Sequence, residues 1–379
     1  MNRRAAMILI LAVGAAFLAA AWIFDWNSVN TYESQNTSTR SYVRARVESV
    51  KSSKMEEAPE GRQLGEQEVR VRILEGAEKG KTVSTVNYLS YAHNVPVRKG
   101  THVILTVDSP EGTAPMYTIM NYDRSVPLWV LVLAFAAAMV LVGRMKGLRA
   151  LLGVTYTLLI ILLFTLQAIY HGFSSLPVTI LTITVSAAMS LVLLNGVSER
   201  TLSGLLATLS GVAVTGIVFQ VFSVLLRISG FNLQDYESLQ MVSMGTGMTI
   251  KGLLLSGVLI SALGAVMDVA VSLAAAIDEL TAVNPALTRA DLFRSGMNIG
   301  KDMIGTMSNT LILAYAGTSM TTLLVLMSLG YQFNQLLSSD LITIELARGI
   351  CSTIGVVLTV PAGSLICAAL YSRREEKVN

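Results

Sequence analysis

Asp268 is the residue best placed to do chemistry in this sequence, because it stands inside a long apolar run, GLLLSGVLISALGAVMDVAVSLAAAI. A carboxylate in hydrocarbon costs about 2.5–3.5 kcal/mol on insertion scales, and such acids commonly mark ion paths and proton relays. On a helix, Asp268 would share one face with small and polar residues at three- and four-residue steps: Gly257, Ser261, Gly264 and Ser272. This spacing predicts a polar stripe that faces protein rather than lipid. A carboxylate that is simply hydrogen-bonded between helices is the alternative.

The following apolar run repeats the pattern with Asp302, Thr306 and Asn309, and Tyr315 lies further along it. Asp302 is either a second candidate for ion coupling or an acid that begins its helix near water, where it suits the N-terminal dipole. Asp268 and Asn309 lie at similar depths, roughly 10 Å from the cytoplasmic ends of their predicted helices.

These depths predict a shared site between the two helices. We expect Asp268, Ser272, Thr306 and Asn309 to face one another in a protein-lined cleft in the cytoplasmic half of the membrane. The small residues Gly264 and Gly305 are expected to let the two backbones approach closely.

Other polar positions favour packing or surface roles. Glu345 and Arg348 are spaced i, i+3 and are predicted to form an interfacial pair at the outer membrane edge. Two further runs carry uncharged small and polar stripes, which we interpret as helix-packing seams: Thr182, Ser186 and Ser190, and then Gly204, Thr208, Gly211 and Thr215.

Motifs for other chemistry are absent from the sequence. It has no Walker-type loop, no Gly-rich dinucleotide fingerprint and no pair of the three histidines at metal-ligand spacing. The sequence therefore predicts no enzyme activity, no cofactor, no metal site and no binding of nucleic acid. The two cysteines, Cys351 and Cys367, lie in one apolar run and predict no disulfide framework.

Composition indicates where these residues are held. Apolar residues make up 53% of the 379-residue chain and charged residues 14%, against about a quarter charged in soluble domains. Eight apolar runs are long enough to cross about 30 Å of hydrocarbon. They lie near residues 6–24, 126–142, 149–170, 176–194, 202–226, 252–275, 303–329 and 347–371. The fold class predicted is an α-helical multipass membrane protein with eight spans.

Residues 26–125 form the only polar stretch of domain size, and alternation of apolar residues predicts a small all-β domain there. The expected strands are Tyr42–Val50, Glu68–Leu74, Thr82–Leu89, His102–Val107 and Tyr117–Met120. Such a set is typical of an OB-like fold, a small barrel or a sandwich. The polar residues 51–66 are expected to form a mobile loop.

The orientation follows from the short loops. With the N-terminus in the cytoplasm, twelve Lys and Arg residues lie at inner ends and three, Arg227, Lys251 and Arg348, at outer ends. Both termini are therefore predicted to be cytoplasmic and the β domain extracytoplasmic. The predicted parts are an N-terminal anchor (1–25), the β domain (26–125), seven spans (126–371) and a cytoplasmic tail (372–379). Residues 1–21 fit a cleavable signal peptide as the alternative to an anchor.

The connection at 276–301 is expected to be the longest cytoplasmic loop. Within it, Thr288 and Asp291 resemble a capping box, and Leu292, Phe293 and Met297 give an apolar face. The segment is interpreted either as an amphipathic helix lying on the membrane or as a plain connector.

Three stretches carry a resemblance to a known family: GAVMDVAVSLAAAIDEL (264–280), GMNIGKDMIGTMSNTLILAYAG (296–317) and ELARGICSTIGVVLTVPAGSL (345–365). The sequence resembles the YibE/YibF-like family of bacterial multispan proteins, which implies a multipass protein of the bacterial plasma membrane. The resemblance adds Asp278, Glu279 and Asn298 to the polar positions of interest. More weakly, the helix pair running into Thr-Thr-Leu-Leu (321–324) is similar to helices of the SecD and SecF export subunits, in which intramembrane polar residues relay protons.

We therefore expect a permease or exporter with an ion- or proton-coupled step at Asp268. The alternative is a non-transporting scaffold or accessory subunit whose β domain binds an envelope partner. Expected partners are the lipid bilayer and either a second copy of the chain or a paralogous membrane subunit.

Overall fold

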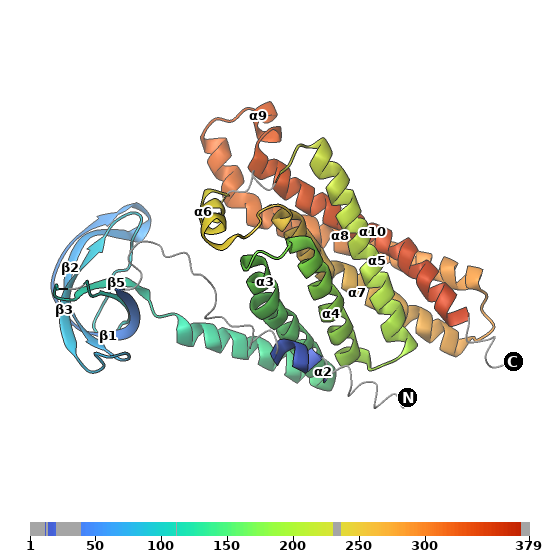
Figure 1. Cartoon of the computed structure of the whole chain (residues 1–379), viewed down its shortest axis with the longest axis horizontal. Helices are drawn as coiled ribbons and strands as arrows, with labels where there is room; N and C mark the ends of the chain where they lie inside the picture. The colour runs from blue at the N-terminus through green and yellow to red at the C-terminus, as the bar shows by residue number, and fades with distance from the viewer. Residues whose placement is uncertain (1–11, 13, 20–38, 111, 230–235, 373–379) are drawn as a thin grey trace. The chain divides into compact units, whose positions relative to one another are not determined.

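The chain divides into two compact units, Glu33–Ala138 and a second unit made of Met1–Tyr32 with Met139–Asn379. A computed structural model describes residues 12, 14–19, 39–110, 112–229 and 236–372 (Figure 1). The first unit contains the β sheet and the second contains most of the helices, so each is treated by itself below.

The β unit is one antiparallel sheet of five strands in the order β3-β2-β1-β4-β5. The strands are β1 (Arg40–Ala58), β2 (Arg62–Ile73), β3 (Thr82–Leu89), β4 (His102–Asp108) and β5 (Met116–Tyr122). The sheet curls so that its two edge strands approach each other, and the Thr85 hydroxyl of β3 donates to the Tyr117 carbonyl of β5. The unit is thus a half-barrel, and all five predicted strands are confirmed.

Alternating apolar residues of the strands fill the concave side of this half-barrel. Ala45, Val71, Val103 and Leu105 are fully buried there and belong to one cluster with the other inward-facing residues. The buried side-chain amide of Gln67 donates a hydrogen bond to the Val97 carbonyl and accepts one from the Val97 N–H. These bonds hold the loop before β4 against the sheet.

The prediction of a mobile loop at 51–66 is wrong. β1 and β2 extend through it as a hairpin that pairs Ser52 with Glu68 and Ala58 with Arg62, closed by a tight turn at Pro59–Gly61. Backbone hydrogen bonds between long strands form regardless of polar side chains when both faces of the ribbon meet water. Cross-strand charges assist, as in the Lys54–Glu66 pair at 3.9 Å.

We predict that the β unit, expressed as residues 38–123, melts cooperatively at neutral pH and loses stability in acid. The Arg40 guanidinium and the Thr39 hydroxyl hold the pKa of Asp108 below its usual value, and Lys81 and Tyr117 do the same for the pKa of Glu78. A carboxyl whose pKa is lower in the folded state contributes stability above its unfolded pKa of about 4 and loses it as the pH falls. The melting temperature should therefore fall between pH 5 and pH 3, measured by circular dichroism.

The matched control is Asp108→Asn, which removes one of these carboxyls but keeps its shape. Its melting temperature should be lower at pH 7 and should fall less on acidification than that of the parent fragment. A fragment without a cooperative transition would show that the β unit depends on the membrane helices, and an acid-insensitive melt would contradict the electrostatic account.

The helical unit contains the long apolar helices (Figure 1). In chain order the helices of the structure are α2 (Ser125–Ile160), a π-helical turn (Ile161–Thr165), α3 (Leu166–Tyr170), α4 (Ser175–Asn195), α5 (Glu199–Leu225), α6 (Tyr236–Thr246), α7 (Leu253–Val283), α8 (Arg289–Ser328), α9 (Phe333–Leu337) and α10 (Asp340–Tyr371). Helix α10 packs against α5, α7 and α8 and forms the centre of this unit.

Small residues make the tightest crossing in the unit, between α5 and α10. A Cβ on Gly211 of α5 would collide with the Thr359 hydroxyl of α10, and a Cβ on Gly355 of α10 would collide with the Thr215 hydroxyl of α5. The contact is reciprocal because the two helices carry the same spacing, GVAVT at 211–215 and GVVLT at 355–359. The packing seam predicted for the first of these helices is confirmed, since Thr208, Gly211 and Thr215 are all buried.

Six helical stretches of the described chain are long and apolar enough to cross a membrane. The predicted runs 126–142 and 149–170 fall within one of them, Ser125–Tyr170, which is interrupted at Arg144 by a φ of +47°. Most of the predicted span 6–24 lies outside the described residues, although 14–19 are helical and Phe17 packs edge-to-face on Phe164 at 4.8 Å.

The long cytoplasmic loop predicted at 276–301 is wrong. Helix α7 continues to Val283 and α8 begins at Arg289, so only residues 284–288 connect them. The capping box of Thr288 and Asp291 is confirmed, and it begins α8 itself rather than a separate surface helix. Helix-forming residues on both sides continue the two spans into this region.

Candidate functional site

Asp268 lies at the midpoint of α7, fifteen residues from Leu253 and fifteen from Val283. At 1.5 Å per residue, this places it about 22 Å from either end of the helix. The predicted stripe is present on one face of α7, and its five members are exposed: Gly257, Ser261, Gly264, Asp268 and Ser272. The opposite face, which includes Val258, Ala262 and Val266, is fully buried.

The carboxylate of Asp268 has no partner within the described part of the chain. No hydrogen bond or ion pair reaches it, and neither the Thr306 nor the Asn309 side chain bonds to it. The Thr306 hydroxyl donates instead to the Met303 carbonyl of its own helix at 3.0 Å. The simple alternative, a carboxylate satisfied between two helices, is therefore not what this conformation contains.

Helix α8 presents a matching face. Asp302, Thr306, Asn309 and Thr310 are exposed, and Asn309 lies at the centre of the 40-residue helix. Helix α8 is anchored elsewhere, through Gly296 and Gly300, which pack tightly on Ser364 and Val360 of α10. Two membrane-length helices, α7 and α8, thus expose polar side chains at their midpoints, a level that bulk water does not reach in a bilayer.

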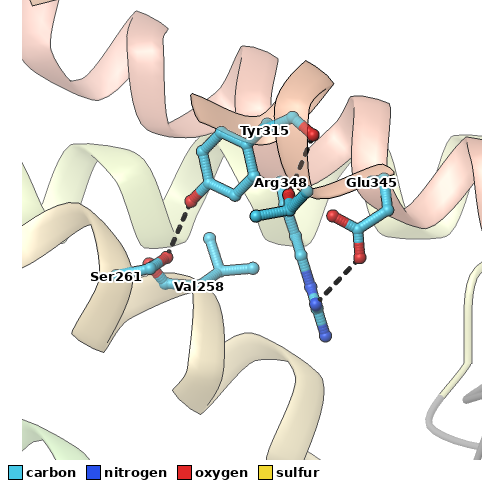
Figure 2. A network of polar contacts seen from close by, with 6 residues as sticks. Val258, Ser261, Tyr315, Glu345 and Arg348 are labelled. Carbon is cyan, nitrogen blue, oxygen red and sulfur yellow. Dashed lines mark hydrogen bonds and ion pairs between the residues drawn. The ribbon is translucent and has the colours of Figure 1, made fainter. Parts of the chain in front are cut away.

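A single hydrogen bond defines how α7 and α8 align. The Tyr315 hydroxyl of α8 donates to the Ser261 hydroxyl of α7 at 3.0 Å, and Ser261 donates in turn to the Val258 carbonyl (Figure 2). The helices are antiparallel neighbours joined by a short connection. Asp268, seven residues after Ser261, is therefore level with Ser308, seven residues before Tyr315.

The alignment brings part of the predicted set to one level. Asp268 of α7 lies at the level of Ser308 and Asn309 of α8. Ser272 lies about one turn further along α7, near the level of Gly305. Tyr315 lies about two turns from this level in the opposite direction, beside Ser261. Ser308 is not among the predicted residues, and its hydroxyl is buried in the described structure without a hydrogen-bond partner. Its position beside Asn309 was the available signal, but a lone serine in an apolar run is ordinary.

The expected close approach of α7 and α8 at Gly264 and Gly305 is wrong. A Cβ built on either glycine would meet no described atom within 4 Å. Side chains of both helices pack instead into a common cluster with Val356 and Val360 of α10, among them Met267 and Met307. Helix α10 takes up the contact, and the two glycine faces are left open.

The remaining predicted residues lie away from this level. On the same alignment Asp278 is level with Asn298, near the connection between the helices, and Asp278 lies beside the Tyr371 hydroxyl of α10. Glu279 and Asn298 are exposed. These three positions form a separate polar end rather than part of the central face.

Glu345 and Arg348 form the predicted pair, with Arg348 Nη1 donating to Glu345 Oε1 at 3.1 Å (Figure 2). The aromatic ring of Tyr315 packs on Gly349, one residue beyond Arg348. The ion pair therefore borders the Tyr315–Ser261 contact. Within the described residues no group of three or more metal-binding side chains is assembled.

Long apolar helices around a packed centre, with polar side chains exposed at the middle of two of them, define a helical multispan membrane protein. The chain belongs to the YibE/F family. Residues 131–373 match the family described as YibE/F-like protein, and residues 38–122 match the YibE/F family N-terminal domain. The resemblance inferred from sequence is confirmed over both units. No curated protein and no solved structure matches the chain.

Proposed function

We propose that this protein is a permease or exporter of the bacterial plasma membrane, with an ion- or proton-coupled step at Asp268. One observation carries the proposal: a carboxylate at the midpoint of a membrane-length helix is exposed and has no partner in the described chain. An ionisable group at that depth faces a bundle interior or a water-filled cavity in membrane proteins, and it marks ion and proton pathways.

The surrounding residues suit such a pathway. Gly257, Gly264 and Gly305 leave open space along the exposed faces of α7 and α8, and Ser272, Thr306 and Asn309 supply hydroxyl and amide groups there. The ionised carboxylate holds a proton or a cation taken from water. The neutral or cation-bound state removes the charge that opposes movement through hydrocarbon, so loading and unloading favour different arrangements of the helices.

The exposed polar face of α7 and α8 also needs a protein partner that shields it from lipid. We propose that a second copy or a paralogous membrane subunit packs on α7 and α8 and encloses the pathway, since open glycine positions let another helix approach closely. The same face supports the second candidate function, a scaffold or accessory subunit in which Asp268 serves only to hold a partner helix.

Profiling of a deletion strain separates the two candidates. Metabolite and metal contents are compared in cells that lack the protein, in cells given the parent gene, and in cells given Asp268→Asn, which is nearly isosteric. A transporter predicts that a solute or ion changes in the deletion strain and is restored by the parent gene but not by Asp268→Asn. A scaffold predicts that Asp268→Asn restores the parental state.

We propose a topology of eight spans with both termini cytoplasmic and the β unit outside. The bias of twelve to three Lys and Arg residues supports it, and the non-helical residue Arg144 supports two spans within Ser125–Tyr170. The contact of Phe17 with Phe164 supports a retained anchor.

Labelling of single cysteines in a chain lacking Cys351 and Cys367 tests this topology. Ser90→Cys should react with an impermeant maleimide added outside intact cells, and Glu376→Cys should react only after lysis. Glu78→Cys is the second reporter of the β unit. Reaction of residue 376 from outside, or protection of residue 90, would contradict the arrangement.

A further inference from the structure

A pocket lined by both polar and apolar side chains opens where three membrane helices end on the same side of the helical unit. Helix α4 begins at Ser175, α5 ends at Leu225 and α7 begins at Leu253, and the pocket of about 720 Å³ lies among these ends. Its polar lining includes Ser174, Gln220, Ser223, Thr249 and Lys251. Hydroxyl, amide and ammonium groups therefore converge at one end of the bundle.

An apolar groove of about 680 Å³ continues from this pocket along the same three helices, α4, α5 and α7. The two share Leu176, Gln220 and Leu255, so they form one continuous hollow. Below the shared residues the lining is almost wholly aliphatic, with Ile180 and Ile183 from α4 and Val212 and Ile217 from α5. The hollow is thus polar at its mouth and apolar along its length.

The groove is as deep as one leaflet of a bilayer. It runs from Leu176 to Thr184 on α4, about 12 Å, and from Val221 to Leu209 on α5, about 18 Å, at 1.5 Å per residue. Half of a hydrocarbon core of about 30 Å is about 15 Å. An occupant that fills both parts has a polar head at the membrane surface and a chain that spans one leaflet.

Charge selects the head group. Lys251 is the one ionisable side chain among the described residues that line the pocket and groove, and it is exposed. It lies two residues before Leu253, the first residue of the 31-residue helix α7, whose N-terminal dipole also favours an anion.

The turn that presents Lys251 is fixed by packing. Gly252 has a φ of +89°, and a Cβ there would lie 2.7 Å from the Ser175 hydroxyl oxygen. That hydroxyl donates to the Lys251 carbonyl at 3.2 Å, which ties the start of α7 to the start of α4. A glycine is required at this position, and the lysine is held at the mouth of the pocket.

We propose that this hollow is a binding site for an anionic phospholipid, with the phosphate head group at Lys251 and one acyl chain in the groove between α4, α5 and α7. The site is separate from the exposed face of Asp268 and does not depend on transport. The apolar groove distinguishes a lipid from a soluble phosphate, which would leave it empty.

Native mass spectrometry of the full-length protein in detergent tests the proposal. The protein is titrated with phosphatidylglycerol, with phosphatidylcholine of the same acyl chains, and with glycerol phosphate. Phosphatidylglycerol should bind most tightly and glycerol phosphate should not bind measurably. Lys251→Ala should weaken phosphatidylglycerol binding about fivefold and leave phosphatidylcholine binding unchanged. Ala213→Trp, which fills the groove, should weaken the binding of both lipids.

Matched controls are Lys301→Ala, an exposed lysine of α8, and Leu206→Trp, an exposed position of α5 outside the groove. Both should bind as the parent does, and Lys251→Arg should retain the preference. Lys251→Gln replaces the alanine variant if the latter does not fold. Equal affinity of the parent for the two lipids, measurable binding of glycerol phosphate, or an unchanged Lys251 variant would overturn the proposal.

Discussion

Replacing Gly211 with valine is expected to destabilise the folded state of the helical unit strongly. The new Cβ would overlap the Thr359 hydroxyl and lie 2.6 Å from Val266 Cγ1, so α5 would clash with α10 and α7 at once. Overpacking of a core costs typically about 1–3 kcal/mol. Both clashing neighbours, Thr359 of α10 and Val266 of α7, are fully buried. The loss should therefore be near the upper end of that range.

Gly264→Val is the matched control, because it makes the same change inside a helix where a Cβ meets no described atom within 4 Å. In detergent, the melting temperature of monomeric Gly264→Val should be near the parental value, and that of monomeric Gly211→Val should be strongly reduced. Gly211→Ala should be partly rescued by Thr359→Ala, which removes the nearest clashing oxygen. Equal stability of the two valine variants would contradict the packing account.

These two glycines also explain what the sequence can predict. Small and polar residues recur at helical spacing in α5, α7 and α10 alike, and the sequence correctly indicates that each forms one face. Whether a face is buried depends on which helix packs on it. Helix α10 covers the stripe of α5 and separates the glycine faces of α7 and α8, and spacing within a single helix holds no information on that choice.

The boundaries of strands and helices are harder to predict where polar residues continue the strand or the helix. The hairpin of β1 and β2 and the joined ends of α7 and α8 run through segments that were interpreted as loops. Backbone hydrogen bonding and capping determine where these strands and helices end, and polar side chains prevent neither of them. The capping box at Thr288 and Asp291 was the local signal that α8 begins there.

The candidate site was predicted in its residues but not in its contacts. Asp268 and the polar positions of α8 lie at one level, as expected from depth, because antiparallel neighbours of equal rise must align once one contact is fixed. No hydrogen bond joins Asp268 to Thr306 or Asn309 in the described structure, so it does not contain the alternative, a carboxylate hydrogen-bonded between the two helices. The spacing of residues along one helix does not indicate whether another helix packs on the exposed face of α7 and α8.

Asp268→Asn is expected to abolish transport while leaving the fold unchanged. The amide has nearly the same shape as the carboxylate, and the position is exposed and has no partner among the described residues, so no buried contact within them is lost. The variant cannot take up a proton or balance a cation charge, which removes the coupled step. Glu237→Gln, an exposed acid of the short helix α6, is the control and should transport at the parental rate.

Flux into proteoliposomes tests the central claim most directly. The cargo is the solute or ion whose cellular content changes in the deletion strain, and a pH-sensitive dye inside the vesicles follows protons at the same time. The account predicts cargo movement above the protein-free background for the parent and for Glu237→Gln, and background movement for Asp268→Asn with an unchanged elution profile. Parental flux through Asp268→Asn would contradict it.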